Sequence, residues 1–162
     1  MDEHSRLITD NALEYGDALP EGGVLLGLDL GTKTIGVATC DAGWRYATAG
    51  KTIERSKFTK DCGKLREIVT ARSVAGVVIG LPRNMDGTEG PRAQASRAYA
   101  RNLSQALELP ILLWDERWST SSADAAMIGQ DMSRAKRAEK IDSHAAAIIL
   151  QGAIDALAGG GF

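Results

Sequence analysis

Three acidic side chains stand at points of this 162-residue sequence where carboxylates are uncommon. Asp29 lies within an apolar run, Glu116 follows a short apolar run, and Asp142 lies on or beside the apolar stripe of a helical pattern. An ionised carboxylate is buried only when it is paired with a cation or bound to a metal ion. Three such carboxylates together would form an oxygen-ligand site that suits Mg²⁺ or Mn²⁺. A site of this kind can activate water for phosphodiester cleavage.

Each of these acids also has a purely structural explanation. Asp29 could cap the turn at Gly31, and Glu116 could form a surface ion pair with Arg117. Asp142 could complement the dipole of its helix from the first turn. That last explanation accounts for an acid near a helix start, but it does not account for one on the apolar side.

Two further residues accompany the acids. Asp115 directly precedes Glu116, so it could support the site or replace Glu116 as the ligand. His144 follows Asp142 by two residues and could carry a proton, although a lone histidine on a helix is more often solvated or packed. No Ser-His-Asp or Cys-His arrangement competes with the acidic site.

Basic side chains gather near the predicted acidic site, although the whole chain carries a net charge of −2. A local concentration of cations favours a polyanionic ligand, here a nucleic acid held by its phosphates. No aromatic platform for base stacking accompanies them, so sequence-specific base recognition is not supported. The predicted phosphate contacts are Lys33, Arg83, Arg117, Arg134, Lys136, Arg137 and Lys140.

Hydrophobic patterns predict the elements that would position these residues. The first three strands are joined by tight links containing glycine, which is typical of an antiparallel meander. The later alternation of helices and strands predicts a mixed α/β sheet with helices on its faces. The predicted strands are 24–30, 34–40, 44–53, 75–81 and 111–114, and the predicted helices are 58–73, 91–107, 119–128 and 140–157.

The length and the hydrophobic content of 44% suit one compact domain. We predict an acidic, flexible extension at 1–22 with one helical turn near 11–15, a single domain at 23–158 and a frayed end at 159–162. No apolar run is long enough to span a bilayer, and the first residues lack an apolar signal-peptide core. We therefore expect a cytoplasmic protein with no membrane partner, whose Cys40 and Cys62 are reduced structural thiols.

Four sequence blocks resemble the YqgF/RuvX family, in the order and spacing of that family. They are GLDLGTKTIGVA at 27–38, GLPRNMDGTEG at 80–90, DERWST at 115–120 and KIDSHAAAIIL at 140–150, and together they cover about residues 24–157. The resemblance implies a ribonuclease-H-like fold, with a five-stranded mixed sheet flanked by helices. It also implies Holliday-junction-resolvase-like nuclease chemistry that acts on the precursor of 16S ribosomal RNA. Residue by residue, it implies that Asp29, Glu116 and Asp142 are the catalytic metal ligands.

Three functional hypotheses remain open from the sequence. The first is an endonuclease acting on structured or single-stranded RNA; a DNA-junction nuclease is its variant and would need a homodimer, for which no clear surface is visible. The second is an ATPase of the sugar-kinase and actin superfamily, whose phosphate loop is matched at 29–36 but which needs two lobes. The third is a non-catalytic RNA-binding module in ribosome biogenesis or transcription.

Overall fold

A mixed sheet of seven strands forms the centre of the computed structural model, which describes residues 7–20, 22–118 and 134–159 but not the side chains of 118 and 134–142. The spatial order is β1-β7-β6-β2-β3-β4, and β5 also pairs with β3. β2 is antiparallel to β3, which is antiparallel to β4 and β5, while β1, β7, β6 and β2 run parallel. The strands are β1 (Ile8–Thr9), β2 (Val24–Leu30), β3 (Thr34–Cys40), β4 (Ala47–Ala49), β5 (Ile53–Glu54), β6 (Val74–Leu81) and β7 (Ile111–Asp115).

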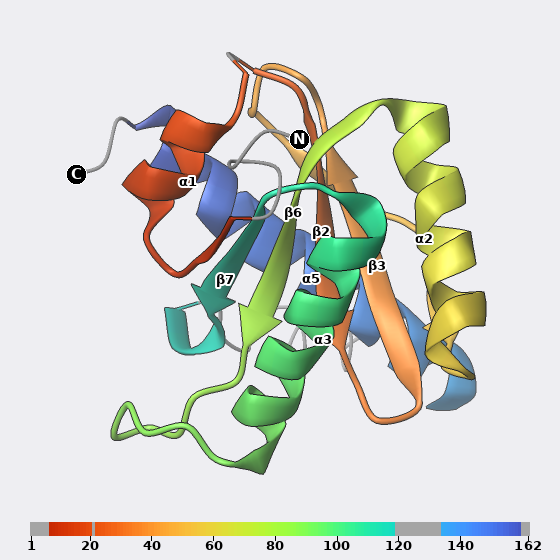
Figure 1. The fold of residues 1–162 in the computed structure, drawn as a ribbon. Helices are drawn as coiled ribbons and strands as arrows, with labels where there is room; N and C mark the ends of the chain where they lie inside the picture. Colours follow the sequence, from red (N-terminus) through yellow and green to blue (C-terminus); the bar gives the residue numbers. More distant parts are fainter. Residues whose placement is uncertain (1–6, 21, 119–133, 160–162) are drawn as a thin grey trace.

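Helices cover both faces of the sheet, and each face has its own apolar core. In Figure 1, α2 and α3 lie on one face, while α1 and α5 lie on the other. Because successive side chains of a strand point to opposite faces, each central strand contributes to both cores. The described helices are α1 (Ala12–Ala18), α2 (Phe58–Arg72), α3 (Pro91–Leu107), the 3₁₀ turn η2 (Glu116–Trp118) and α5 (Arg134–Ala158).

A glycine in β2 lets α5 lie close to the sheet. A Cβ atom at Gly27 would stand 2.8 Å from the Cβ of Leu150 and 3.2 Å from the backbone oxygen of Ala146. No larger residue fits there without moving the helix. This contact fixes α5 above the same face of β2 that carries Asp29, two residues further along the strand.

The structure confirms the α/β fold with an antiparallel first part, but the sheet has more strands than predicted. The expected strand 44–53 is divided into β4 and β5. A turn around Asp41, whose carboxylate accepts the backbone N–H groups of Gly43, Arg45 and Tyr46, delays the start of β4 to Ala47. Trp44 takes a positive φ of 57° within this turn. The predicted helix 119–128 lies outside the described residues.

The prediction of a flexible extension at 1–22 is wrong for residues 7–20. β1 pairs with β7 in parallel, so this segment belongs to the sheet. In α1, Asn11 caps the helix by accepting the N–H groups of Leu13 and Glu14. Tyr15 is fully buried, and its hydroxyl donates to the backbone oxygen of Val77 at 2.9 Å.

No helix in the described ranges is both long and apolar enough to cross a membrane.

Candidate active site

Asp29 and Glu116 meet at the carboxyl ends of parallel strands. Asp29 is the penultimate residue of β2, and Glu116 begins η2 directly after β7. β6 lies between these two strands and has a glycine, Gly80, at the level where they end. A Cβ atom at Gly80 would collide with the carboxylate of Glu116 and would stand 2.7 Å from Cδ1 of Ile149. The bare backbone of Gly80 therefore makes room for Glu116 beneath α5.

An open pocket of about 160 Å³ lies at this point. Among the described residues, its lining consists of Asp29, Glu116, Ala145 and Ile149. The two acids come from the sheet and η2, and the two apolar residues come from α5. The pocket is thus an acidic recess roofed by a helix, on the carboxyl edge of the sheet, where ligands of open α/β sheets gather.

The two carboxyl groups do not both carry a full charge in the protein alone. Burial, followed by the negative charge of Asp29, raises the pKa of Glu116 to about 8. A hydrogen bond from protonated Glu116 to Asp29 acts in the same direction, while the nearby Arg92 guanidinium opposes the shift. A proton therefore holds the pair together near neutral pH.

A divalent cation fits this pair of acids. Carboxylate oxygens are the ligands that Mg²⁺ and Mn²⁺ prefer, and a cation between two crowded carboxylates would replace the shared proton and its electrostatic role. The residues whose side chains the structure describes contain no group of three or more acids, histidines or cysteines that could hold a metal ion. The third predicted ligand, Asp142, lies in α5 three residues before Ala145, and its side chain is outside the description.

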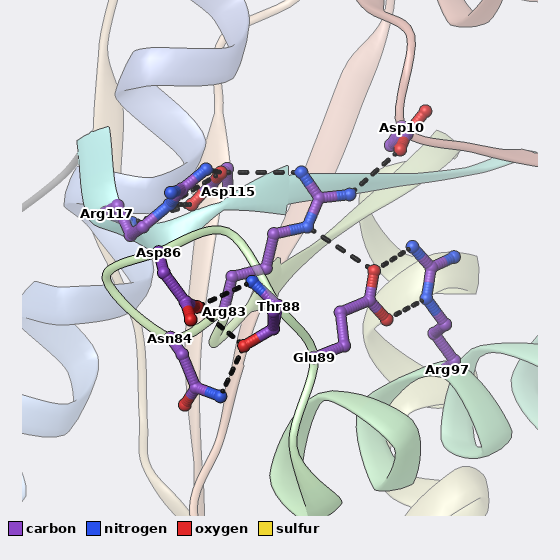
Figure 2. Close-up of polar contacts among 9 residues, drawn as sticks. All are labelled: Asp10, Arg83, Asn84, Asp86, Thr88, Glu89, Arg97, Asp115 and Arg117. Carbon is purple, nitrogen blue, oxygen red and sulfur yellow. Dashed lines mark hydrogen bonds and ion pairs between the residues drawn. The ribbon is translucent and has the colours of Figure 1, made fainter.

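Asp115 has a different environment from Glu116, although the two residues are adjacent. It is buried, and Arg117 Nη2 lies 2.6 Å from its carboxylate while Arg117 Nε donates to both of its oxygens at 3.0 Å. Arg83 approaches the same carboxylate at 3.5 Å (Figure 2). The hydrogen bonds from Arg117 hold the pKa of Asp115 below its usual range. Asp115 is therefore an ion-paired structural acid on the α3 face of the sheet, apart from Asp29.

This ion pair extends into a network that fixes the loop between β6 and α3. Arg83 also contacts Asp10 at 3.0 Å and Glu89 at 3.4 Å, and Glu89 accepts two hydrogen bonds from Arg97. Figure 2 shows the three arginines and three of the acids that they contact converging from separate segments. The network joins the N-terminal segment, the loop and the end of β7.

The loop itself is ordered by its own polar side chains. Asp86 accepts the hydroxyl and the backbone N–H of Thr88 at 2.6 and 3.0 Å, and these bonds lower the pKa of Asp86. The amide of Asn84 donates to the hydroxyl of Thr88 at 2.9 Å. Arg117 Nη1 donates to the backbone oxygen of Met85, which ties the loop to the residue after Glu116.

The predicted phosphate contacts divide into three groups. Lys33 is exposed on the turn between β2 and β3. Arg83 and Arg117 lie with Asp115 and do not line the acidic pocket. His144, predicted as a supporting residue, is exposed on α5 and does not line the pocket either. The third group of predicted phosphate contacts consists of basic residues whose side chains the structure does not describe: Arg134, Lys136, Arg137 and Lys140.

Arg92 lies near the acids but was not among the predicted phosphate contacts. It stands in the first turn of α3, donates to the backbone oxygen of Leu30 at 3.0 Å, and lowers the pKa of Glu116. Its place directly after Pro91, at a helix start that follows a polar loop, is the signal that could have indicated it.

Comparison with solved structures shows the same fold at low sequence identity. The RuvC protein of T. thermophilus, solved in complex with a Holliday junction substrate, is 12% identical with a TM-score of 0.55, over 85% of this chain and 96% of that one. The yeast mitochondrial Holliday junction resolvase Ydc2 is 13% identical with a TM-score of 0.50, over 92% of this chain and 85% of that one.

Comparison of sequences identifies much nearer relatives. A protein of Novosphingobium aromaticivorans, named "Putative pre-16S rRNA nuclease", is 68% identical over 96% of this chain and the whole of that protein. A protein of the same name from Sphingopyxis alaskensis is 60% identical over 93% of this chain and 99% of that one. The family described as "RuvX: Holliday junction resolvase" matches residues 23–156. The chain therefore belongs to the RuvX family.

Proposed function

We propose that this protein is a divalent-metal-dependent endonuclease that hydrolyses phosphodiester bonds of nucleic acid and matures the 5′ end of the 16S ribosomal RNA precursor in the cytoplasm. The observation that carries the proposal is the meeting of Asp29 and Glu116 in one pocket over Gly80. The names of the near relatives support RNA as the substrate.

Asp29, Glu116 and Asp142 are the residues that would hold the ion. Mg²⁺ or Mn²⁺ in this pocket would activate water and stabilise the leaving oxygen of the cleaved bond. The chain itself keeps Asp29 and Glu116 close together by the bare backbone at Gly80. Ala145 and Ile149 would limit the access of bulk water from above. Lys33, exposed on the neighbouring turn, would contact a phosphate.

The test is cleavage of an RNA fragment that spans the 5′ end of 16S ribosomal RNA and its precursor sequence. It is run with Mn²⁺, with Mg²⁺ and with chelator, beside a four-way DNA junction of matched length. We expect the RNA to be cut to products with a 5′-phosphate, only when metal is present. Asp29→Asn and Asp142→Asn should each reduce the rate at least about 100-fold, because even residues that only orient metal ligands contribute 10–100-fold.

Asp17→Asn is the matched control, since Asp17 is exposed on α1 and the same change of charge there should leave the rate unchanged. A cleavage rate in Asp29→Asn equal to that of the unmodified protein would overturn the proposal. Cutting of the junction alone would assign the DNA activity instead. RNA that is bound but uncut in both metals would favour the non-catalytic binding module.

A further inference from the structure

A second recess lies on the opposite side of the β2–β3 turn from the acidic pocket. It consists of two adjoining pockets of about 90 and 300 Å³, which share Arg55, Ala95 and Tyr99. The smaller pocket begins at Gly31 and Thr32, just beyond the end of β2, and the larger one continues between α2 and α3. The two helices lie side by side on this face of the sheet (Figure 1). We call this recess the α2–α3 groove.

One buried hydroxyl in the groove finds no acceptor within the part of the chain that the structure describes. Tyr99 is 7% exposed and lines both pockets, yet its hydroxyl has no hydrogen-bond partner among the described residues. Burial, with the nearby charge of Asp61, raises the pKa of Tyr99 to about 12, so the hydroxyl keeps its proton near neutral pH. A buried donor without a partner is rare in folded proteins and calls for a ligand that can accept its proton.

Arg55 lies over the aromatic ring that carries this hydroxyl. Its Nη1 donates to the backbone oxygen of Gly31 at 2.6 Å, and its own backbone N–H donates to the oxygen of Lys33 at 2.9 Å. The central carbon of its guanidinium lies over the ring of Tyr99, 5.4 Å from the ring centroid. Arg55 is exposed, but the two contacts of its guanidinium orient the cation before any ligand arrives, so less conformational entropy remains to be lost on binding.

Arg92 adds a second cation at the same end of the groove. One of its N–H groups donates to the backbone oxygen of Leu30. A guanidinium carries five N–H donors in all. In the described part of the chain, neither Arg55 nor Arg92 forms an ion pair with a carboxylate, whereas Arg83 and Arg117 are both paired. Asp61, in the larger pocket, accepts three hydrogen bonds from Ser56. The positive end of the groove is therefore the smaller pocket.

We propose that the smaller pocket binds a backbone phosphate of the nucleic-acid strand that is cleaved at the acidic pocket. Tyr99 and Ser96 would donate their hydroxyls to the phosphate, and Arg55 and Arg92 would neutralise its charge. The volume of about 90 Å³ corresponds to roughly three water molecules, which suits a small anionic group. Gly31 is only two residues from Asp29, so the two pockets lie at either side of one turn. This inference rests on the proposed function.

The test measures binding without cleavage. A short fluorescent single-stranded RNA is titrated with the full chain in chelator, by anisotropy, over a series of salt concentrations. Arg55→Gln should weaken binding and reduce the slope of log affinity against log salt by about 0.7, the value for one phosphate contact on a single strand. Tyr99→Phe should weaken binding roughly 10-fold, as expected for a hydrogen bond to a charged group, with the salt slope unchanged.

The matched control is Arg101→Gln, which removes an exposed arginine from the same helix outside the groove. We expect it to bind within twofold of the unmodified protein. Tyr99→Phe leaves the ring in place and removes only an unpartnered hydroxyl, so it keeps the test valid if Arg55→Gln does not fold. Unchanged affinity in Tyr99→Phe, or an equal loss in Arg101→Gln, would overturn the inference.

The two proposals fail separately. If the protein cuts no nucleic acid but Arg55→Gln and Tyr99→Phe still weaken RNA binding as described, the groove stands and the nuclease proposal falls. If the protein cuts RNA and both variants bind it normally, the nuclease proposal stands and the groove does not bind phosphate.

Discussion

The side chains of Asp115 and Glu116 are adjacent in the chain but lie on opposite faces of the sheet. Asp115 ends β7 with its carboxylate enclosed by Arg117 and Arg83, while Glu116 turns under α5 to meet Asp29. The cations lower the pKa of Asp115, whereas burial and a neighbouring acid raise the pKa of Glu116. The two acids should therefore respond to pH in opposite directions.

The first prediction concerns the pH dependence of stability at Glu116. Because its folded pKa is raised to about 8, its contribution to the stability of the metal-free protein is present at acidic pH and is lost as pH rises through 8. Glu116→Gln should remove this loss. At pH 8 the variant should therefore melt a few degrees above the unmodified protein, which corresponds to a gain of about 1 kcal/mol in the free energy of unfolding. The measurement is the melting temperature of both proteins in chelator from pH 5 to 8.5. If the two melting temperatures change in parallel with pH, the prediction is contradicted.

The second prediction concerns Asp115. Its lowered pKa means that its contribution is present above the ordinary Asp range and is lost as pH falls through the folded pKa. Asp115→Asn should destabilise the protein by about 2 kcal/mol at pH 7, because it leaves Arg117 and Arg83 without their shared partner. Urea unfolding at pH 7 and near pH 3 should show the difference shrinking in acid. A constant difference would refute the ion-pair explanation.

The third prediction concerns the close approach at Gly80. Gly80→Ala would place a Cβ against Glu116 and Ile149, so it should abolish cleavage and reduce stability by about 1–3 kcal/mol. Gly63→Ala is the matched control, because a Cβ at Gly63 in α2 meets nothing within 4 Å. It should raise stability by up to about 1 kcal/mol and leave cleavage unchanged. An active Gly80→Ala protein would show that Glu116 does not need this room.

The fourth prediction concerns the N-terminal segment. Tyr15→Phe removes the hydrogen bond to the backbone oxygen of Val77 without changing the shape of the ring, and it should cost about 1 kcal/mol. Deletion of residues 1–20 should cost several times more, because it also removes Leu19 and Tyr15 from the core beneath α5. Leu13→Ala, at an exposed position of the same helix, serves as the control for Tyr15→Phe. Equal melting of the truncated and full chains would contradict this role.

Hydrophobic patterns predicted the central elements well because the buried strands are continuous apolar runs and the helices have a helical spacing of apolar residues. The helix 91–107 and the strands 24–30 and 34–40 coincide with α3, β2 and β3. The apolar run before Asp115 and the glycines around Asp29 indicated where two strands of the sheet end, β7 and β2. The N-terminal segment was missed, since a two-residue strand such as β1 has no period and depends on a partner far along the chain.

The arrangement of charges was less accessible from the sequence. Spacing could not decide between Asp115 and Glu116, because the direction of each side chain depends on where β7 ends. Arg83 and Arg117 were predicted to contact substrate, and only tertiary contacts show that both meet Asp115. Arg55 and Tyr99 were not singled out, since the groove between α2 and α3 exists only once the helices pack. The ligand roles of Asp29, Glu116 and Asp142 stay predictions.

The pairing of β1 with β7 also sets the order in which this protein can fold. Ile8 pairs with Ile111, so the first strand to leave the ribosome waits for a partner made about a hundred residues later. Contacts so distant in sequence form slowly, because a large loop must close before they form. We therefore expect the sheet to grow outward from the β2–β3 hairpin, with β1 as the last strand to join. Until it does, β7, which leads into Glu116, keeps one open edge.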